Sequence, residues 1–157
     1  MVRLKLIGHE LYVEIADEVL NVIYEEALSS YPFEGGGFLF GAYTEDRSLA
    51  QILLMVKSPS THASGSSFLR SVSEKQFMRI HKETGLHYLG EWHSHPDGNA
   101  QYSGIDRQAM IEIAEYNKTE IENPLLMIVS VKSRKVKGYE IYMYDNKQLL
   151  RYEQDRS

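Results

Sequence analysis

Residues 90–96 read Gly-Glu-Trp-His-Ser-His-Pro, and this stretch carries the most specific pattern in the chain. Side chains two positions apart on a β-strand lie on the same face, so His93 and His95 can bind one metal ion together. Pro96 ends the strand and places both rings beside a loop. The stretch therefore predicts a strand over residues 86–95 that ends in a pair of imidazole ligands.

A second polar group follows this strand at a fixed spacing. Seven residues separate His95 from Ser103, and Asp106 comes three residues later. Ser103 is typical of a helix N-cap, although one hydroxyl cannot easily cap a helix and serve a reaction strongly at once. The helix would pack on the sheet through a stripe at helical spacing, which consists of Ile105, Ala109, Ile113 and Tyr116. Packed in this way, its first turn returns Asp106 to the histidines, and this ligand set leaves a fourth position open on zinc.

Each of these two motifs has a simpler interpretation when taken alone. A His-x-His pair is usually structural or incidental, and Ser-x-x-Asp at a helix start is usually only a cap. Together at this spacing, they arise by chance in roughly one such chain in a thousand. The combination therefore favours a metal site.

A third candidate group precedes a glycine-rich strand. Residues 33–41 read Phe-Glu-Gly-Gly-Gly-Phe-Leu-Phe-Gly, and Glu34 is a carboxylate that could take a proton from water. Its position alone favours an exposed glutamate in a helix-to-strand turn. A phosphate-binding glycine loop is a poor third interpretation, because no Lys-Ser or Lys-Thr follows and the glycines precede a strand.

The rest of the chain predicts a mixed α/β fold in one domain over residues 1–157. A mixed central β-sheet is expected, flanked by about three helices. Helices are expected over residues 16–29, from Ser73 to about residue 84 and from Ser103 onward; further strands are expected over 2–8, 12–14, 38–43, 49–56, 125–131 and 136–144.

Composition excludes several classes of protein. The chain has 157 residues, a formal net charge of −5 and no cysteine, so it has no disulfide, thiol nucleophile or thiolate metal site. The acidic balance argues against nucleic acid and anionic membranes as partners. The longest apolar runs, 52–56 and 125–129, are far below the ~18 residues of a membrane span. Residues 1–8 lack a signal-peptide core, and we expect a cytoplasmic protein.

The combined pattern resembles the JAMM (MPN-plus, or JAB) metallopeptidase family. Glu34 is followed by Gly-Gly-x-Leu-x-Gly, and residues 93–96, Ser103 and Asp106 fill the remaining positions of that family's motif. The Gly-Glu-Trp before the histidines is more similar to compact prokaryotic JAB proteins than to eukaryotic deubiquitinases. The resemblance implies a single JAB/MPN domain.

The resemblance also implies a role for each motif residue. His93, His95 and Asp106 would bind one zinc ion per chain. Glu34 would be the general base for a zinc-activated water, and Ser103 would donate a hydrogen bond to the tetrahedral intermediate. Two neighbours could support these groups without binding the metal: Glu91 and Ser94.

The family implies a substrate class as well. Its usual substrates are isopeptide or peptide bonds after the C-terminal tail of ubiquitin or a ubiquitin-like protein, in deconjugation or precursor processing. Conjugation enzymes are candidate partners, and residues 57–70 either add a strand to hold the tail or form an ordinary loop. Two alternatives stay open: the same zinc site acting on small peptides or sulfur-carrier adducts, and a non-catalytic MPN scaffold. Scaffold members usually lose the ligands or the base, and this chain keeps all of them.

Overall fold

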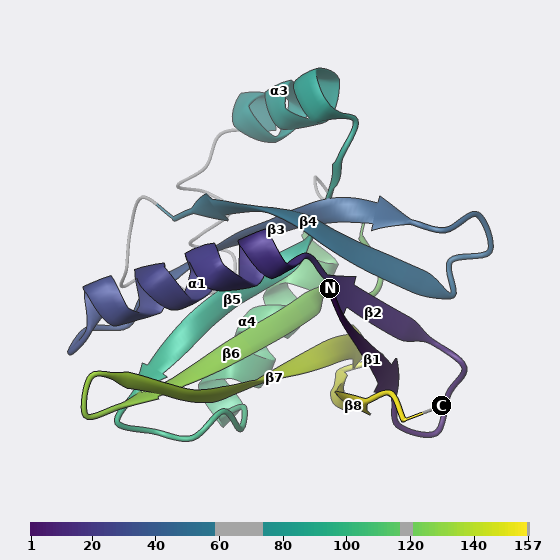
Figure 1. Ribbon diagram of the computed structural model, residues 1–157. Helices are drawn as coiled ribbons and strands as arrows, with labels where there is room; N and C mark the ends of the chain where they lie inside the picture. The colour runs from purple at the N-terminus through teal and green to yellow at the C-terminus, as the bar shows by residue number, and fades with distance from the viewer. Residues whose placement is uncertain (59–73, 117–120, 157) are drawn as a thin grey trace.

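In the computed structural model, residues 1–58, 74–116 and 121–156 are described, and they contain eight strands and three helices (Figure 1). The strands are β1 (Val2–Leu6), β2 (Tyr12–Ile15), β3 (Gly36–Tyr43), β4 (Leu49–Lys57), β5 (His87–Pro96), β6 (Leu125–Lys132), β7 (Lys135–Asp145) and β8 (Gln148–Gln154). The helices are α1 (Asp17–Ser30), α3 (Glu74–Thr84) and α4 (Gly104–Glu115). The predicted mixed α/β class is confirmed. The expected cap at Ser73 and most of the 57–70 segment lie outside the described residues.

The strands form one mixed sheet that closes on itself in the order β1-β2-β4-β3-β5-β6-β7-β8. Two neighbouring pairs are parallel, β2 with β4 and β5 with β6, and the others are antiparallel. The sequence did not predict β8, which pairs with both β7 and β1 and closes the barrel. Only Leu149 and Tyr152 are buried in β8, so it lacks the regular alternation that marks a strand.

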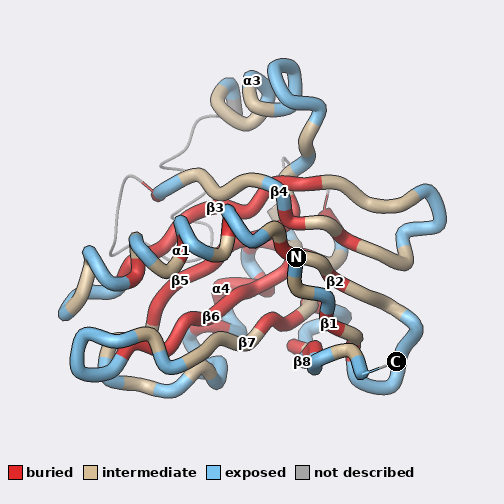
Figure 2. The backbone as a smooth tube through the Cα atoms, viewed as in Figure 1, coloured by how far each residue is buried: buried red, intermediate tan, exposed pale blue. Residues whose placement is uncertain are grey.

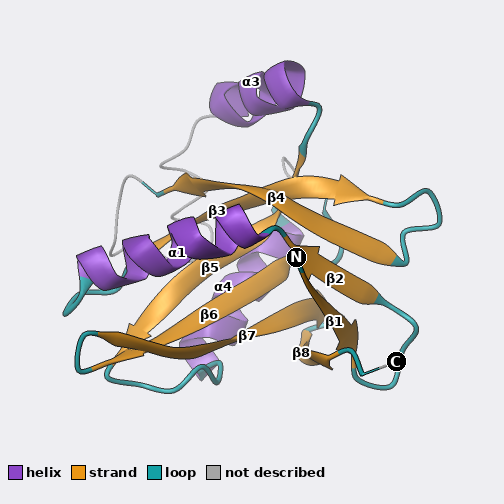
Figure 3. Ribbon diagram, in the orientation of Figure 1, coloured by secondary structure: helices purple, strands orange, loops and turns teal. Residues whose placement is uncertain are grey.

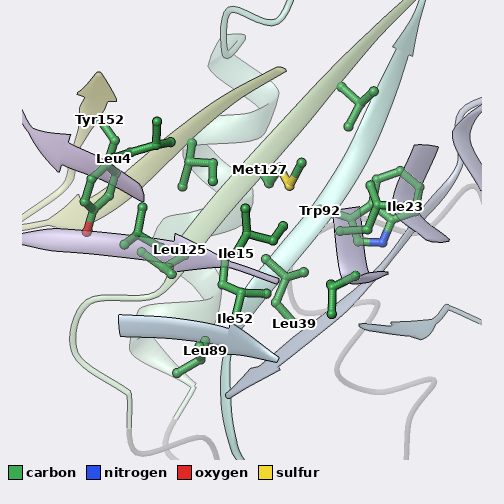
Figure 4. Packing of buried hydrophobic residues seen from close by; sticks show 14 of the residues in the cluster. Leu4, Ile15, Ile23, Leu39, Ile52, Leu89, Trp92, Leu125, Met127 and Tyr152 are labelled. Carbon is green, nitrogen blue, oxygen red and sulfur yellow. The ribbon is translucent and has the colours of Figure 1, made fainter. Parts of the chain in front are cut away.

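Two apolar clusters lie on opposite faces of the strands around β5. The first fills the inside of the closed sheet under α1 and includes Ile23, Ile52 and Trp92 (Figure 4). The second lies on the outer face and joins Phe38 of β3 to Met110 of α4. Figure 3 shows α1 in front of the sheet and α4 behind it. Strand β5 is therefore buried on both faces along most of its length, as Figure 2 shows.

Helix α4 packs on the outer face through a stripe that differs from the predicted one. Asp106, Ala109, Met110 and Ile113 are buried at the spacing i, i+3, i+4, i+7, whereas the side chain of Ile105 is 74% exposed. The prediction that Ile105 is buried is therefore wrong. The rotation that exposes Ile105 turns Asp106 toward the sheet, so a carboxylate occupies the first position of an otherwise apolar stripe.

Gly90 has a backbone conformation that leaves no room for a side chain next to β6. Its φ is +155°, and a Cβ atom there would collide with the carbonyl oxygen of Leu125. The parallel register then runs without interruption from Gly90 opposite Leu125 to Pro96 opposite Val131. Among the described helices, none is long and apolar enough to cross a membrane.

Candidate metal centre

Three side chains converge at the end of β5. The Nε2 atoms of His93 and His95 are 3.2 Å apart. One carboxylate oxygen of Asp106, Oδ1, lies 3.0 Å from Nε2 of His93, and the other, Oδ2, lies 3.2 Å from Nε2 of His95. One atom from each residue lies within 4.8 Å of the other two. The structure therefore brings together the three residues that the sequence proposed as ligands, and they could hold a metal ion.

A reciprocal capping box fixes the carboxylate of Asp106. The Asp106 N–H donates to Oγ of Ser103 over 3.1 Å, and the Ser103 N–H donates to Oδ2 of Asp106 over 2.8 Å. Ser103 thus caps α4, as predicted. Its hydroxyl only accepts in this contact, so its O–H can still donate to another group. The two roles of Ser103 therefore do not compete for the same part of the hydroxyl.

A backbone contact fixes the tautomer of His95. Nδ1 of His95 lies 2.8 Å from the carbonyl oxygen of Asn99, which can only accept, so Nδ1 carries the proton. In the neutral ring the lone pair is then on Nε2, which faces the other two ligands and is available to a metal ion. In the protonated ring Nε2 also carries a proton and donates to Asp106. The loop that supplies this carbonyl is itself held by β6, because the Ser130 hydroxyl donates to the carbonyl oxygen of Gly98.

The electrostatics of the cluster suit a cation. Burial alone would raise the pKa of the Asp106 carboxyl, but hydrogen bonds from both imidazoles and from the Ser103 N–H hold it well below its usual range. The hydrogen bond to Asp106 raises the pKa of His95. Two imidazole nitrogens and an ionised carboxylate are the donor set of catalytic zinc sites, so the residues fit that ion.

The segment that carries Glu34 is joined to the histidine strand by the next residue in the chain, Gly35. The Gly35 N–H donates to Oγ of Ser94 over 2.8 Å, and the Ser94 N–H donates to the carbonyl oxygen of Gly35 over 2.9 Å. The charge of Glu34 also contributes to raising the pKa values of Glu91 and His95. Glu34, an exposed residue, is therefore carried by a segment that is hydrogen-bonded to the strand of both histidines.

Glu91 lies beneath the cluster and is not one of the three converging residues. Its side chain is buried, and burial raises the pKa of its carboxyl to about 7, with smaller contributions from Asp106 and Glu34. Its Oε2 atom has no hydrogen-bond partner among the described residues. Glu91 pairs across the sheet with Phe38 and thus faces the side on which α4 lies.

Sequence reasoning did not find the residues that support this site from elsewhere in the chain. They are Asn99, Ser130, Tyr31 and Asp97. The hydroxyl of Tyr31 donates to Oδ1 of Asp97 over 2.7 Å and joins the segment before Glu34 to the loop after Pro96. These contacts depend on the strand register and on a backbone carbonyl, and neither leaves a signal in the sequence.

The closed mixed sheet, with two histidines at a strand end and an aspartate from the adjoining helix, defines the class as a JAB/MPN-type domain. A solution structure from Desulfitobacterium hafniense is similar with a TM-score of 0.64 and 15% identity, covering 91% of this chain and 89% of that one. A crystal structure of a JAB1/MPN domain protein from Archaeoglobus fulgidus is similar with a TM-score of 0.52 and 17% identity, covering 91% and 94%. At these identities the likeness concerns the fold alone.

The chain belongs to the family of prokaryotic homologs of the JAB domain, whose model matches residues 16–143. A curated relative from Enterobacter hormaechei subsp. hoffmannii (strain UCI 50) is named a CD-NTase/cGAS isopeptidase. It is 32% identical over an alignment of 119 residues, and the match covers 74% of this chain and 66% of that relative. The chain thus matches just under two thirds of the relative's length.

Proposed function

We propose that this protein is a zinc-dependent isopeptidase that cleaves the bond after the C-terminal tail of a ubiquitin-like protein. The observation that carries the proposal is the convergence of His93, His95 and Asp106 within 4.8 Å, with an ionised carboxylate and a fixed imidazole tautomer. The JAB family and the relative that is named an isopeptidase support this reaction type. A pure scaffold would not need all three ligands held in this geometry.

The chain's own groups supply each proton transfer that amide hydrolysis requires. When bound, zinc lowers the pKa of water to about 7 and polarises a carbonyl group. The Glu34 carboxylate accepts the proton from water and passes it to the leaving amine. The Ser103 hydroxyl accepts the capping hydrogen bond with a lone pair, and its O–H would donate a hydrogen bond to the oxygen on which negative charge develops.

A cleavage assay with and without a chelator tests this proposal directly. The purified protein should carry about one zinc ion per chain and cut at least one ubiquitin-like fusion from a panel. A chelator should stop cleavage, and added zinc should restore it. The relative's name suggests one further substrate, a ubiquitin-like protein conjugated to a CD-NTase or cGAS enzyme. Small peptides and sulfur-carrier adducts are included in the panel to test the alternative substrates. Full activity in metal-free protein, or a zinc-loaded protein that cuts no conjugate, would contradict the proposal.

Exposed apolar side chains stand next to the proposed catalytic groups. Phe33 precedes Glu34 and is 63% exposed, and Ile105 precedes Asp106 and is 74% exposed. Tyr102, which precedes Ser103, is 40% exposed. Large exposed apolar groups at a site offer contact area for a protein substrate. This placement supports a polypeptide substrate over a small polar one.

We therefore expect Phe33→Ala and Ile105→Ala each to raise KM by about 5- to 30-fold, since losing such a contact costs about 1–2 kcal/mol. Because neither side chain is a ligand, zinc content should not change and kcat should stay within about two-fold. Steady-state kinetics on the best conjugate measures both constants. Val22→Ala is the matched control, because Val22 is also exposed, at 47%, but lies on α1. An equal rise in KM for this control would mean that the residues next to the site have no special role.

A further inference from the structure

Ser94 lies between the two histidines in sequence but belongs to the opposite face of β5. Its side chain is 1% exposed, and it makes two hydrogen bonds to a single residue, Gly35. Its hydroxyl accepts from the Gly35 N–H, and its own N–H donates to the Gly35 carbonyl oxygen. We call this contact, which consists of two hydrogen bonds, the Ser94–Gly35 pair. It joins the residue between two ligands to the residue after the proposed base.

The carboxylate of Glu34 has no hydrogen bond or ion pair of its own among the described residues. Its position therefore depends on the backbone that carries it. On the C-terminal side, that backbone is fixed by the Ser94–Gly35 pair, which is buried. On the N-terminal side, the Phe33 N–H donates to the carbonyl oxygen of Ser30 within the same turn. The hydrogen bond between Tyr31 and Asp97, which joins this turn to the loop after Pro96, is exposed to solvent and therefore weaker.

Gly35 is fitted closely into its place. A Cβ atom there would lie 2.7 Å from Oγ of Ser30 at the end of α1, so a larger residue would force the Ser30 side chain to move. The next residue, Gly36, is paired with His93 in the sheet. Gly35 thus lies between the end of α1 and the histidine strand, and the buried Ser94 hydroxyl is the side-chain group that holds its N–H.

We propose that Ser94 is a positioning residue that sets the distance between the Glu34 carboxylate and the metal site through Gly35. This inference rests on the proposed function, in which Glu34 is the base. Ser94 itself touches neither the substrate nor the metal. Without its hydroxyl, the Gly35 N–H is buried without a partner, and the segment that carries Glu34 relaxes away from the histidines.

The kinetic test compares Ser94→Ala with Ser94→Thr. Because a displacement of about 1 Å can cost a reaction about 100-fold, Ser94→Ala should lower kcat by about 10- to 100-fold, with KM within about two-fold. Zinc content should not change, because all three ligands remain. Ser94→Thr keeps the hydroxyl and should restore most of kcat. An unchanged kcat in Ser94→Ala, or a loss of zinc in parallel with activity, would overturn the proposal.

A double-mutant cycle shows whether Ser94 acts through Glu34. In a Glu34→Gln background the base is already absent, so adding Ser94→Ala should not lower the residual rate further. If the two losses multiply, Ser94 acts on another part of the site and the proposal is wrong.

A measurement without substrate separates this inference from the proposed function. In the zinc-loaded protein, Ser94→Ala should accelerate hydrogen exchange of the Gly35 amide by about 10- to 100-fold, and Ser94→Thr should restore its protection. The amide of Leu126, in the buried strand β6, is the internal reference and should not change. If wild-type protein cuts no conjugate, the proposed function fails, yet Gly35 exchange still decides whether Ser94 holds this segment. Unchanged exchange in Ser94→Ala overturns the inference even in an active enzyme.

Discussion

Replacing Asp106 by asparagine is expected to lower zinc affinity by at least about 100-fold and to abolish cleavage, while the fold is kept. The amide oxygen can still accept the Ser103 N–H, so the capping box loses little. However, the asparagine side chain lacks the negative charge that attracts the metal ion, and the two imidazoles alone bind the ion weakly. Asp106→Ala should lose the same zinc affinity and, in addition, about 0.5–1 kcal/mol of helix stability.

His95→Ala gives the companion result. It removes one ligand and leaves the Ser103–Asp106 capping box in place, so zinc and activity should fall together. The metal-free protein should lose only the stability that the His95 contacts with Asp106 and Asn99 contribute. Metal analysis after gel filtration, calorimetric titration with zinc and thermal unfolding of metal-free samples measure these quantities. A His95→Ala protein that keeps one tightly bound zinc ion and wild-type rates would show that the metal site lies elsewhere.

Local chemistry explains why four of the site residues, His93, His95, Ser103 and Asp106, are predictable from the sequence. The alternation of a strand places His93 and His95 on one face whatever the rest of the chain does. The capping box between Ser103 and Asp106 spans only three residues and forms within its own helix turn. Both signals are short-range, and the structure contains both.

The predictions that failed depend on long-range packing. Strand β8 closes the sheet by pairing with β1 at the other end of the chain, as in the pair Leu4 and Gln154. The apolar pattern predicts Ile105 in the buried stripe, because an apolar residue fits that pattern better than a carboxylate. The helix instead buries Asp106, and such departures from the apolar pattern are expected at functional sites.

The support around the proposed base was also beyond the reach of sequence reasoning. The bond between Gly35 and the Ser94 hydroxyl joins residues 59 positions apart. It exists only because β3 and β5 pair in a register that puts Gly36 opposite His93. The sequence alone shows that Ser94 lies between two ligands. Only the strand register shows that Ser94 also contacts the segment that carries Glu34.

Replacing Glu34 by glutamine should leave zinc bound and lower kcat by at least about 1,000-fold, with little change in KM. Glutamine keeps the size of the side chain but cannot take a proton from water. Because Glu34 is not one of the three converging residues, the metal ion keeps all of its protein ligands. Zinc analysis of the same sample used for kinetics separates the two effects, and a loss of metal would mean that Glu34 is a ligand.

Glu91 is the competing base, and its own variant decides between the two carboxylates. Its pKa of about 7 would suit proton transfer, but its side chain is only 3% exposed. Glu34 is exposed to solvent, and the residue after it is hydrogen-bonded to Ser94 on the histidine strand. We therefore expect Glu91→Gln to lower kcat far less than Glu34→Gln. The reverse order would assign the proton transfer to Glu91. The expected order would mean that the buried Glu91 carboxylate supports the site without taking part in the proton transfers.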